Sequence, residues 1–332
     1  MQEALFYKKL DNNKVRCKLC PHECIIREEK VGICSGRKNI KGKLYAVNYG
    51  KTISLSMDPI EKKPLYHFFP GKKILSIGPN GCNLSCKFCQ NHMSSQNKVP
   101  TRNITPEELF TYCKENNSIG VAYTYTEPLI WYEFILDSAN FLRKNNKKVV
   151  LVTNGTIKEE PLKKILPFVD AMNVDLKSMR ENFYNKICNG YLETVKRTIR
   201  LAAQETHIEI TYLVIPEYND SEEEINELVD FIDNINSDIP LHISRYFPAY
   251  KLDASPTPNN LLKKIYETAK KKLTNVYIGN TNIENTTNTI CPNCNEVLIR
   301  RQGFFGDIKN IISKNNTCPK CGTNIYGKNL SQ

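Results

Sequence analysis

The stretch Gly81–Asn91 reads GCNLSCKFCQN and decides the fold expected for this chain. It carries Cys82, Cys86 and Cys89, and it follows an apolar run at 74–78 that is typical of a buried strand ending in a turn. Three thiolates at these spacings can hold one face of a [4Fe–4S] cluster, which takes four ligands. Because the stretch has no fourth cysteine, one iron stays open to a small molecule that brings its own donors. The alternative is a zinc site with a distant fourth ligand.

Outward from this stretch, strand-like and helix-like segments alternate. Helical signals include a cap at Thr105 followed by Pro106, apolar residues at helical spacing over 129–142, and a capping box that begins at Ser221. The alternation predicts an α/β fold, and the number of units favours a partial (β/α)6 TIM-like barrel over an open doubly wound sheet. Catalytic residues of barrels lie at the C-terminal ends of strands. The further strand-like segments are 119–123, 149–153, 171–174, 208–215 and 241–246.

The thirteen cysteines indicate metal sites rather than disulfides. All except Cys113 and Cys188 fall into three tight groups with short spacings, which suit several ligands on one metal. The last group predicts a zinc ribbon, with rubredoxin-like iron as the alternative. The first group predicts either structural zinc or a second [4Fe–4S] cluster, with His22 as a possible replacement ligand. The ribbon cysteines are Cys291, Cys294, Cys318 and Cys321, and those of the first group are Cys17, Cys20, Cys24 and Cys34.

The cysteine groups also divide the chain. We expect an N-terminal metal-binding region with a lid at 1–70, a barrel at 71–284 and a zinc ribbon at 285–332, so that small cysteine-rich modules stand at both termini.

No apolar stretch approaches the roughly 18 residues of a membrane helix, and no signal peptide is evident, so a cytoplasmic location is expected. The net charge of +11 admits a nucleic-acid partner, but Lys and Asn are abundant everywhere and no basic stripe stands out.

The spacing Cys-x3-Cys-x2-Cys after the first strand, with Phe88 before the third cysteine, resembles the signature of the radical S-adenosylmethionine (SAM) superfamily. The resemblance implies a [4Fe–4S] cluster whose open iron is chelated by the amino and carboxylate groups of SAM. It also implies reductive cleavage of SAM to a 5′-deoxyadenosyl radical that abstracts hydrogen. A reductant such as flavodoxin or ferredoxin would then be a partner.

Three further motifs at strand ends resemble SAM-contacting positions of that superfamily. Glu127 is the candidate acceptor for the methionine amino group, although threonine stands where the family usually has glycine. Asn154 belongs to a Thr-Asn-Gly turn, and Asp175 with Lys177 forms an Asp-Leu-Lys motif similar to that of pyruvate formate-lyase activating enzymes. The alternatives are a helix-dipole acid for Glu127, an ordinary turn for Asn154 and a solvated strand end for the last pair.

The segment 57–68 reads MDPIEKKPLYHF and resembles the radical enzyme of the AmmeMemoRadiSam system. That resemblance implies Memo-like and AMMECR-domain proteins as partners from the same cassette. Within the segment, Tyr66 and His67 are candidate substrate contacts, and by charge alone the run could instead be a solvated hairpin. On the sixth strand, His242 and Arg245 are further candidates, the latter for a carboxylate or phosphate.

Three functions are consistent with these features. The first is a radical SAM enzyme that acts on an unidentified substrate. The second is an activating enzyme that installs a glycyl radical on another protein. The third is a non-catalytic zinc-ribbon module that binds nucleic acid.

Overall fold

The computed structural model describes residues 1–308 and 315–330 and is built around an eight-stranded sheet. The strands are β8 (Leu55–Pro59), β9 (Lys73–Ile77), β11 (Gly120–Tyr123), β12 (Lys148–Thr153), β13 (Ala171–Asp175), β14 (His207–Val214), β15 (Leu241–Arg245) and β16 (Val276–Gly279). Their order in the sheet is β16-β15-β14-β13-β12-β11-β9-β8. Neighbouring strands are parallel, except that the edge strand β8 runs antiparallel to β9.

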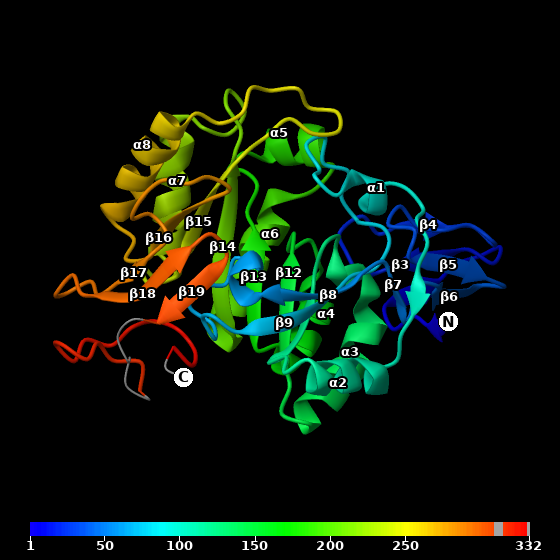
Figure 1. Ribbon diagram of the computed structural model, residues 1–332. Coiled ribbons are helices and arrows are strands. Elements are labelled where there is room, and N and C mark those ends of the chain that lie inside the picture. The colour runs from blue at the N-terminus through cyan, green and yellow to red at the C-terminus, as the bar shows by residue number, and fades with distance from the viewer. Residues whose placement is uncertain (309–314, 331–332) are drawn as a thin grey trace.

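The predicted α/β alternation is confirmed, because each expected strand coincides with β9 or with one of β11 to β15. The strands are mostly apolar, and β11 is buried along its whole length, as expected for a parallel sheet flanked by helices. Figure 1 shows β8 and β9 lying across the view while β13 and β14 run up it. The helices are α2 (Pro106–Glu115), η2 (Pro128–Trp131), α3 (Tyr132–Lys144), α4 (Glu159–Ile165), η3 (Leu166–Phe168), α5 (Glu181–Phe183), η4 (Tyr184–Cys188), α6 (Leu192–Glu205), α7 (Glu222–Asp233) and α8 (Asn259–Lys270).

Two helix starts show how the sequence signals work. The Thr105 side chain accepts from Glu108 N and the Glu108 carboxylate accepts from Thr105 N, so the predicted cap of α2 is a full capping box. Ser221 caps α7 by accepting from Glu224 N at 3.2 Å. A full capping box would also have the Glu224 carboxylate accept from Ser221 N, and this half of the prediction is wrong. The Glu224 carboxylate is buried and accepts instead from Ser178, from Met179 N and from the Tyr212 hydroxyl.

The two edge strands, β8 and β16, were not predicted. β8 contains serine and aspartate and ends at Pro59, a composition that is unusual inside a sheet but tolerated at an edge. β16 has only four residues and follows a lysine-rich turn. Because β8 pairs with β9, the end of the predicted N-terminal region contributes a strand to the main sheet.

The N-terminal region consists of small antiparallel sheets that pack against the main sheet's helices. A bidentate ion pair fixes them there: both Arg37 Nη atoms donate to the Glu133 carboxylate of α3 at 2.8 Å, and both side chains are almost fully buried. The short elements are β1 (Gln2–Glu3), β6 (Lys43–Ala46) and β5 (Arg37–Ile40) in one sheet, β2 (Tyr7–Lys9), β3 (Val15–Cys17) and β4 (Ile25–Ile26) in a second, β7 (Lys51–Thr52) with β10 (Arg102–Asn103), and the helices η1 (Ile60–Lys62) and α1 (His92–Ser95).

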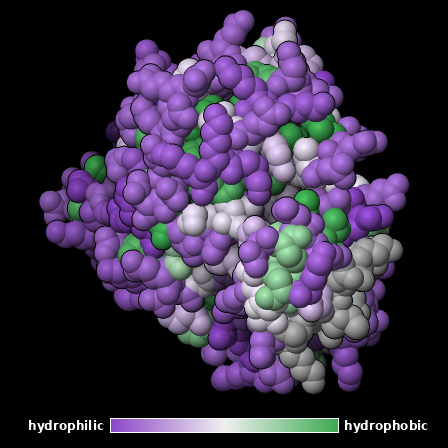
Figure 2. All heavy atoms as spheres, turned by 90° about the vertical axis from the view of Figure 1, so that its left-hand side faces the viewer, coloured by the Kyte–Doolittle hydropathy of each residue, from purple (hydrophilic) through white to green (hydrophobic). Residues whose placement is uncertain are grey.

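The C-terminal segment is a three-stranded antiparallel sheet of β17 (Thr289–Ile290), β18 (Val297–Gln302) and β19 (Phe305–Ile308). It contacts the 57–68 segment: Lys328 N donates to His67 O at 2.8 Å, and Arg301 donates to Tyr66 O at 2.6 Å. The face of the molecule on this side is mostly hydrophilic (Figure 2). Among the residues described, no helix is long and apolar enough to cross a bilayer.

Candidate functional site

The loop after β9 brings its three cysteines to the end of the parallel strands. Hydrogen-bond donors are aimed at two of the sulfur atoms. Leu84 N lies 3.3 Å from Cys82 Sγ, and the Ser95 hydroxyl lies 3.2 Å from Cys89 Sγ. Donors at these positions stabilise thiolates, and thiolates rather than thiols bind metals. The residues present therefore fit an iron–sulfur cluster held at three corners.

The π-helical turn η4 supports this loop. Ser85 N donates to Cys188 O and Lys87 N to Ile187 O, both at 2.9 Å, so the loop and the turn run side by side. A hydrogen bond with the Cys188 side chain lowers the pKa of Cys86, against the effect of burial. No sequence pattern indicates this role for Cys188, because Cys188 stands alone and a long connection separates it from the loop. Its place in a π-helical turn is a recurrent feature of functional sites.

Glu127 lies at the end of β11, one strand away from the cysteine loop. It is 1% exposed, and its carboxylate accepts from the Thr153 hydroxyl at 2.7 Å, Leu129 N at 2.9 Å and Asn154 N at 2.8 Å. Burial raises the pKa of Glu127 to about 7, although these three donors lower it in part. The carboxylate is thus fixed in place and can change charge near neutral pH.

The loop before Glu127 has an unusual backbone. Tyr125 has a φ of 71°, a conformation that favours glycine. Two contacts hold it there: its hydroxyl donates to Asp58 at 2.9 Å, and its carbonyl accepts from Asn91 at 2.6 Å. The segment 57–68 and the cysteine loop therefore impose together a backbone conformation that tyrosine rarely adopts.

Asn154, Asp175 and Lys177 complete the arrangement at the neighbouring strand ends. Asn154 Nδ2 lies 3.6 Å from Cys82 Sγ, so the Thr-Asn-Gly turn reaches the cysteine loop directly. Lys177 Nζ lies 3.0 Å from Asp175 Oδ2 and 5.9 Å from the centre of the Phe88 ring. Burial alone would lower the pKa of Lys177, but Asp175 and the neighbouring thiols raise it well above its usual value. The predicted cofactor-binding residues thus lie around one point.

The family model described as the radical SAM superfamily matches residues 76–232, the part of the chain that carries these residues. Over almost its full length the chain is similar to the uncharacterized protein MJ0808 of Methanocaldococcus jannaschii, with 45% identity over 98% of this chain and 99% of that protein. This chain belongs to the radical SAM superfamily. The family resemblance drawn from the cysteine spacing is thereby confirmed.

More distant relatives match only part of the chain. The pyruvate formate-lyase 1-activating enzyme of Escherichia coli K12 is 24% identical over 49% of this chain and 69% of that protein. A solved radical SAM methyltransferase from Sphaerobacter thermophilus matches with a TM-score of 0.51 and 16% identity, over 64% of this chain and 67% of that one. The second likeness shows the fold alone.

Three other candidate residues of this radical SAM protein, Tyr66, His67 and His242, lie away from the cysteine loop. His242 lies near the start of β15, and its Nε2 atom is 2.6 Å from Oε2 of Glu209. The buried Glu209 carboxylate also accepts from the backbone N atoms of Tyr66 and His67. These residues form one polar network toward the strands' N-terminal ends, whereas the cysteine loop follows a C-terminal end. Arg245, at the end of β15, has a buried Nε that finds no hydrogen-bond partner within the described part of the chain.

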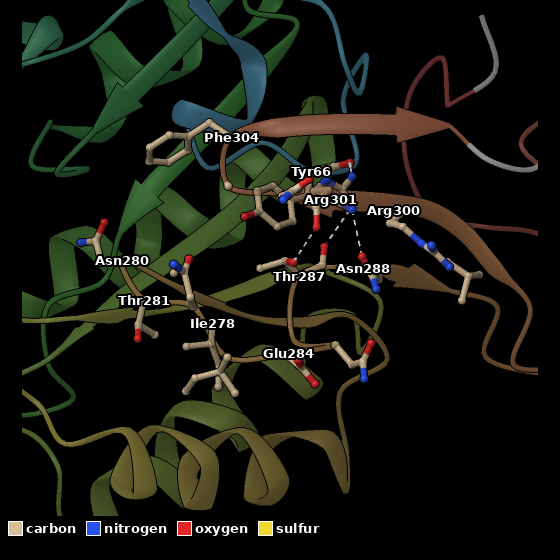
Figure 3. Close-up of a pocket in the computed structure, with 17 residues that line it drawn as sticks. Tyr66, Ile278, Asn280, Thr281, Glu284, Thr287, Asn288, Arg300, Arg301 and Phe304 are labelled. Atoms are coloured by element: carbon tan, nitrogen blue, oxygen red, sulfur yellow. Dashed lines mark hydrogen bonds between the residues drawn. The ribbon is translucent and has the colours of Figure 1, made fainter.

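A cavity of about 940 Å³ lies between β16 and the C-terminal strands. Figure 3 shows Asn280 and Thr281 on one side, Phe304 on another, and Tyr66 beside Arg301 between them. The Arg301 guanidinium stacks 4.2 Å from the centre of the Tyr66 ring. No residue of the cysteine loop lines this cavity, so its size is no argument for the radical chemistry. It adjoins the strand ends, because Asn280 donates to Ser244 and to Arg245 O.

The four ribbon cysteines form a compact group. Their sulfur atoms all lie within 4.8 Å of one another. The pKa of the Cys321 thiol is lowered to about 6, chiefly by a hydrogen bond with Thr323, so a thiolate is available there near neutral pH. The N-terminal cysteines are arranged differently, because they line a shared, mostly apolar cavity. His22 does not line it, and its ring hydrogen-bonds the Asn83 backbone.

Proposed function

We propose that this protein is an enzyme that binds SAM at a [4Fe–4S] cluster held by Cys82, Cys86 and Cys89 and cleaves it reductively. The observation that supports the proposal most is the convergence of Glu127, Asn154 and the 175–177 motif on this loop, described above. When bound, the cluster and SAM supply a 5′-deoxyadenosyl radical that abstracts hydrogen from a substrate. The chain's own residues hold, orient and shield these groups.

The roles of the surrounding residues follow from their charges and positions. Glu127 would accept the amino group of SAM, a charge-assisted hydrogen bond once the carboxylate is ionised. Lys177 would attract the SAM carboxylate, and Asp175 is exposed enough to receive a ribose hydroxyl. Phe88 is 5% exposed and would shield the cluster from water.

We further propose that the main sheet curves into a partial (β/α)6 barrel, with metal-binding modules at 1–70 and 285–332. Its edges β8 and β16 do not pair with each other in the described residues, so the barrel would be partial rather than closed. The cavity of Figure 3 lies beside β16 and would hold the non-reacting part of the substrate against Tyr66. His67 and His242 would act through the network that positions Tyr66, and Arg245 would meet an anionic group at the strand ends.

The 57–68 segment supports placing this enzyme in the AmmeMemoRadiSam system. Its residues pair with three separate parts of the fold: Asp58 with Tyr125, Tyr66 with Arg301, and His67 with the buried Tyr277. A segment with such specific partners accounts for the distinctive sequence on which the resemblance rests. Memo-like and AMMECR-domain proteins would then make or use the substrate, and flavodoxin or ferredoxin would supply electrons.

The test is anaerobic reconstitution followed by reduction with dithionite and addition of SAM. We expect the wild type to form 5′-deoxyadenosine and the Cys82→Ala/Cys86→Ala/Cys89→Ala variant to form none. A Cys113→Ala variant is the matched control, because Cys113 is buried and its thiol donates only to Gly120 O, at 3.3 Å, within the part described. A wild-type protein that holds only zinc and cleaves no SAM would instead support a zinc-ribbon binding module.

A second candidate is glycyl-radical activation of another protein. It is favoured by large aromatic side chains that stay exposed beside the strand ends, among them Tyr218, Phe247 and Tyr250 at 38–42% exposure. Such residues suit contact with a macromolecular substrate. Transfer of deuterium from a glycine-labelled partner protein into 5′-deoxyadenosine would establish this activity. If no deuterium is transferred while a small-molecule substrate is present, the first candidate is favoured.

A further inference from the structure

The ribbon cysteines and the N-terminal cysteines differ in spacing. In the ribbon, Cys291 Sγ lies 3.6 Å from Cys321 Sγ, and Cys294 Sγ lies 3.6 Å from Cys318 Sγ. Zinc–sulfur bonds of about 2.3 Å in a tetrahedron put the sulfur atoms about 3.8 Å apart, so this group fits a single ion. Across residues 1–308 and 315–330, no other group brings three or more such ligand atoms within 4.8 Å of one another. No three of the four N-terminal sulfur atoms therefore lie within 4.8 Å of one another.

These sulfur atoms nevertheless belong to one site. All four N-terminal cysteines line the same cavity, whose walls are otherwise mainly leucine and isoleucine side chains. A [4Fe–4S] cluster takes one thiolate on each of four separate iron atoms, so it holds four sulfur atoms farther apart than a single ion does. The spacing and the apolar walls thus suit a four-iron cluster better than zinc. The lining cysteines are Cys17, Cys20, Cys24 and Cys34.

A separate observation comes from Arg37, which lines the same cavity and is 1% exposed. Its two Nη atoms donate to Glu133, but its buried Nε has no hydrogen-bond partner among the described residues. A buried donor without a partner is costly. The sulfur atoms of a cluster are acceptors that would satisfy it, and such hydrogen bonds help to set a cluster's reduction potential.

The cavity lies between the protein surface and the active-site loop. On its outer side it is lined by Ile33, which is 53% exposed. On its inner side it is lined by Asn83, the residue after Cys82. The two segments touch along their backbones, because a Cβ atom at Gly81 would come within 2.3 Å of the Cys34 carbonyl oxygen. An electron that enters at this site has a short path to the cysteine loop.

We infer that Cys17, Cys20, Cys24 and Cys34 hold a second [4Fe–4S] cluster that relays electrons to the active-site cluster. The inference rests on the proposed function for the direction of transfer. The electron source is a low-potential one-electron donor protein, which is oxidised as the second cluster is reduced. The second cluster then returns to its oxidised state as the active-site cluster gains that electron.

Metal and sulfide analysis of the reconstituted full chain, with Mössbauer spectra, tests the cluster. We expect about eight iron atoms in the wild type and about four in each of the Cys82→Ala/Cys86→Ala/Cys89→Ala and Cys20→Ala/Cys24→Ala variants, with zinc unchanged. Cys113→Ala should keep about eight. The inference would be overturned if the wild type held about four iron atoms and an additional zinc, and if the triple variant lost all of its iron. If Cys20→Ala/Cys24→Ala does not fold, the metal contents of the wild type and the triple variant still decide whether the second cluster exists.

Freeze-quench electron paramagnetic resonance with a reduced flavodoxin tests the relay. In Cys20→Ala/Cys24→Ala we expect the active-site cluster to be reduced at least ten-fold more slowly, while the spectral change on adding SAM to dithionite-reduced protein stays the same. An unchanged reduction rate would overturn the relay. About eight iron atoms without SAM cleavage would support the second cluster and contradict the proposed function instead.

Discussion

The side-chain amide of Asn154 lies 3.6 Å from the sulfur atom of Cys82, which joins the end of β12 to the loop after β9. The same amide nitrogen donates to Asn83 Oδ1 at 2.9 Å, and the amide oxygen accepts from Thr156 N at 2.8 Å. These contacts hold the amide in one orientation, with its N–H groups toward the cysteine loop. A predicted turn asparagine is thereby part of the sulfur atom's immediate surroundings.

Replacing Asn154 with aspartate should damage the active-site cluster. The substitution removes a donor to Cys82 and places a negative charge beside a thiolate. Loss of a hydrogen bond to a charged group costs about 1.5–3 kcal/mol, so we expect SAM cleavage to fall at least ten-fold. Iron content and 5′-deoxyadenosine formation measure the effect. Asn234→Asp at the exposed end of α7 is the control, and equal losses in both variants would contradict a specific role for Asn154.

SAM affinity should depend on pH through Glu127. Burial raises the pKa of this carboxyl to about 7, so the charged form needed by the amino group becomes available as the pH rises through 7. We expect the Kd for SAM to fall between about pH 6 and 8 in the wild type and to stay flat in Glu127→Gln. The raised pKa also means that any stability this group contributes is present at low pH and is lost as the pH rises through about 7. Parallel pH profiles in the two proteins would exclude this role.

Removing the charge of Lys177 should lower the reduction potential of the active-site cluster. The ammonium group is near the thiols of Cys86 and Cys188, and its positive charge favours the more negative, reduced cluster. We expect Lys177→Met to shift the midpoint by about 30–60 mV to more negative values, which corresponds to about 1 kcal/mol for one electron. A redox titration followed by paramagnetic resonance measures it. Lys264→Met removes an exposed lysine and should leave the potential unchanged.

The Glu209 network should contribute strongly to stability. Its carboxylate accepts from two backbone N atoms and contacts His207 and His242 at 2.9 and 2.6 Å, with no exposure to solvent. Disrupting such a buried charged network typically costs about 3–5 kcal/mol, and we expect Glu209→Gln to lower the free energy of unfolding by about that amount. Glu193→Gln disrupts an exposed pair and should cost under about 1 kcal/mol. Urea unfolding compares the two, and similar midpoints would contradict the prediction.

Removal of the zinc proposed for the ribbon cysteines should destabilise the main sheet. Cys321 is exposed, so a chelator can reach this ligand. Once the ribbon loosens, Arg301 no longer holds Tyr66, and we expect Tm to fall by about 5 °C on chelation. Differential scanning calorimetry with a zinc assay checks this. Restoring zinc should restore Tm, whereas an unchanged Tm after complete zinc removal would show that the ribbon folds without it.

The strands predicted from the sequence are those whose burial produces a clear run of apolar residues in the sequence. β9 and β11 to β15 are short apolar runs bounded by turns, and their order along the chain is the order of parallel units. β8 mixes serine and aspartate with apolar residues, whereas β16 is apolar but has only four residues. The predicted capping box at Ser221 was half wrong, because Glu224 is drawn into the interior by Ser178 and Tyr212. Such long-range competition leaves no local signal.

The residues of the candidate site were likewise predicted only in part from the sequence. The cysteine loop, Glu127, Asn154 and Lys177 come from motifs at strand ends, and parallel strands bring those ends together regardless of sequence distance. Cys188 was missed because its partner Cys86 lies far away in the chain. Tyr66 and His67 were predicted as substrate contacts, and their place in the Glu209 network depends on residues from three distant strands. Their contact with substrate stays a prediction.

The hydrogen bond from Arg301 to Tyr66 O joins residues 235 positions apart. A ribosome makes Tyr66 long before Arg301, so the nascent sheet must wait for the ribbon before this end of its interior is closed. A prematurely terminated chain would carry every residue of the cysteine loop yet lack this last contact.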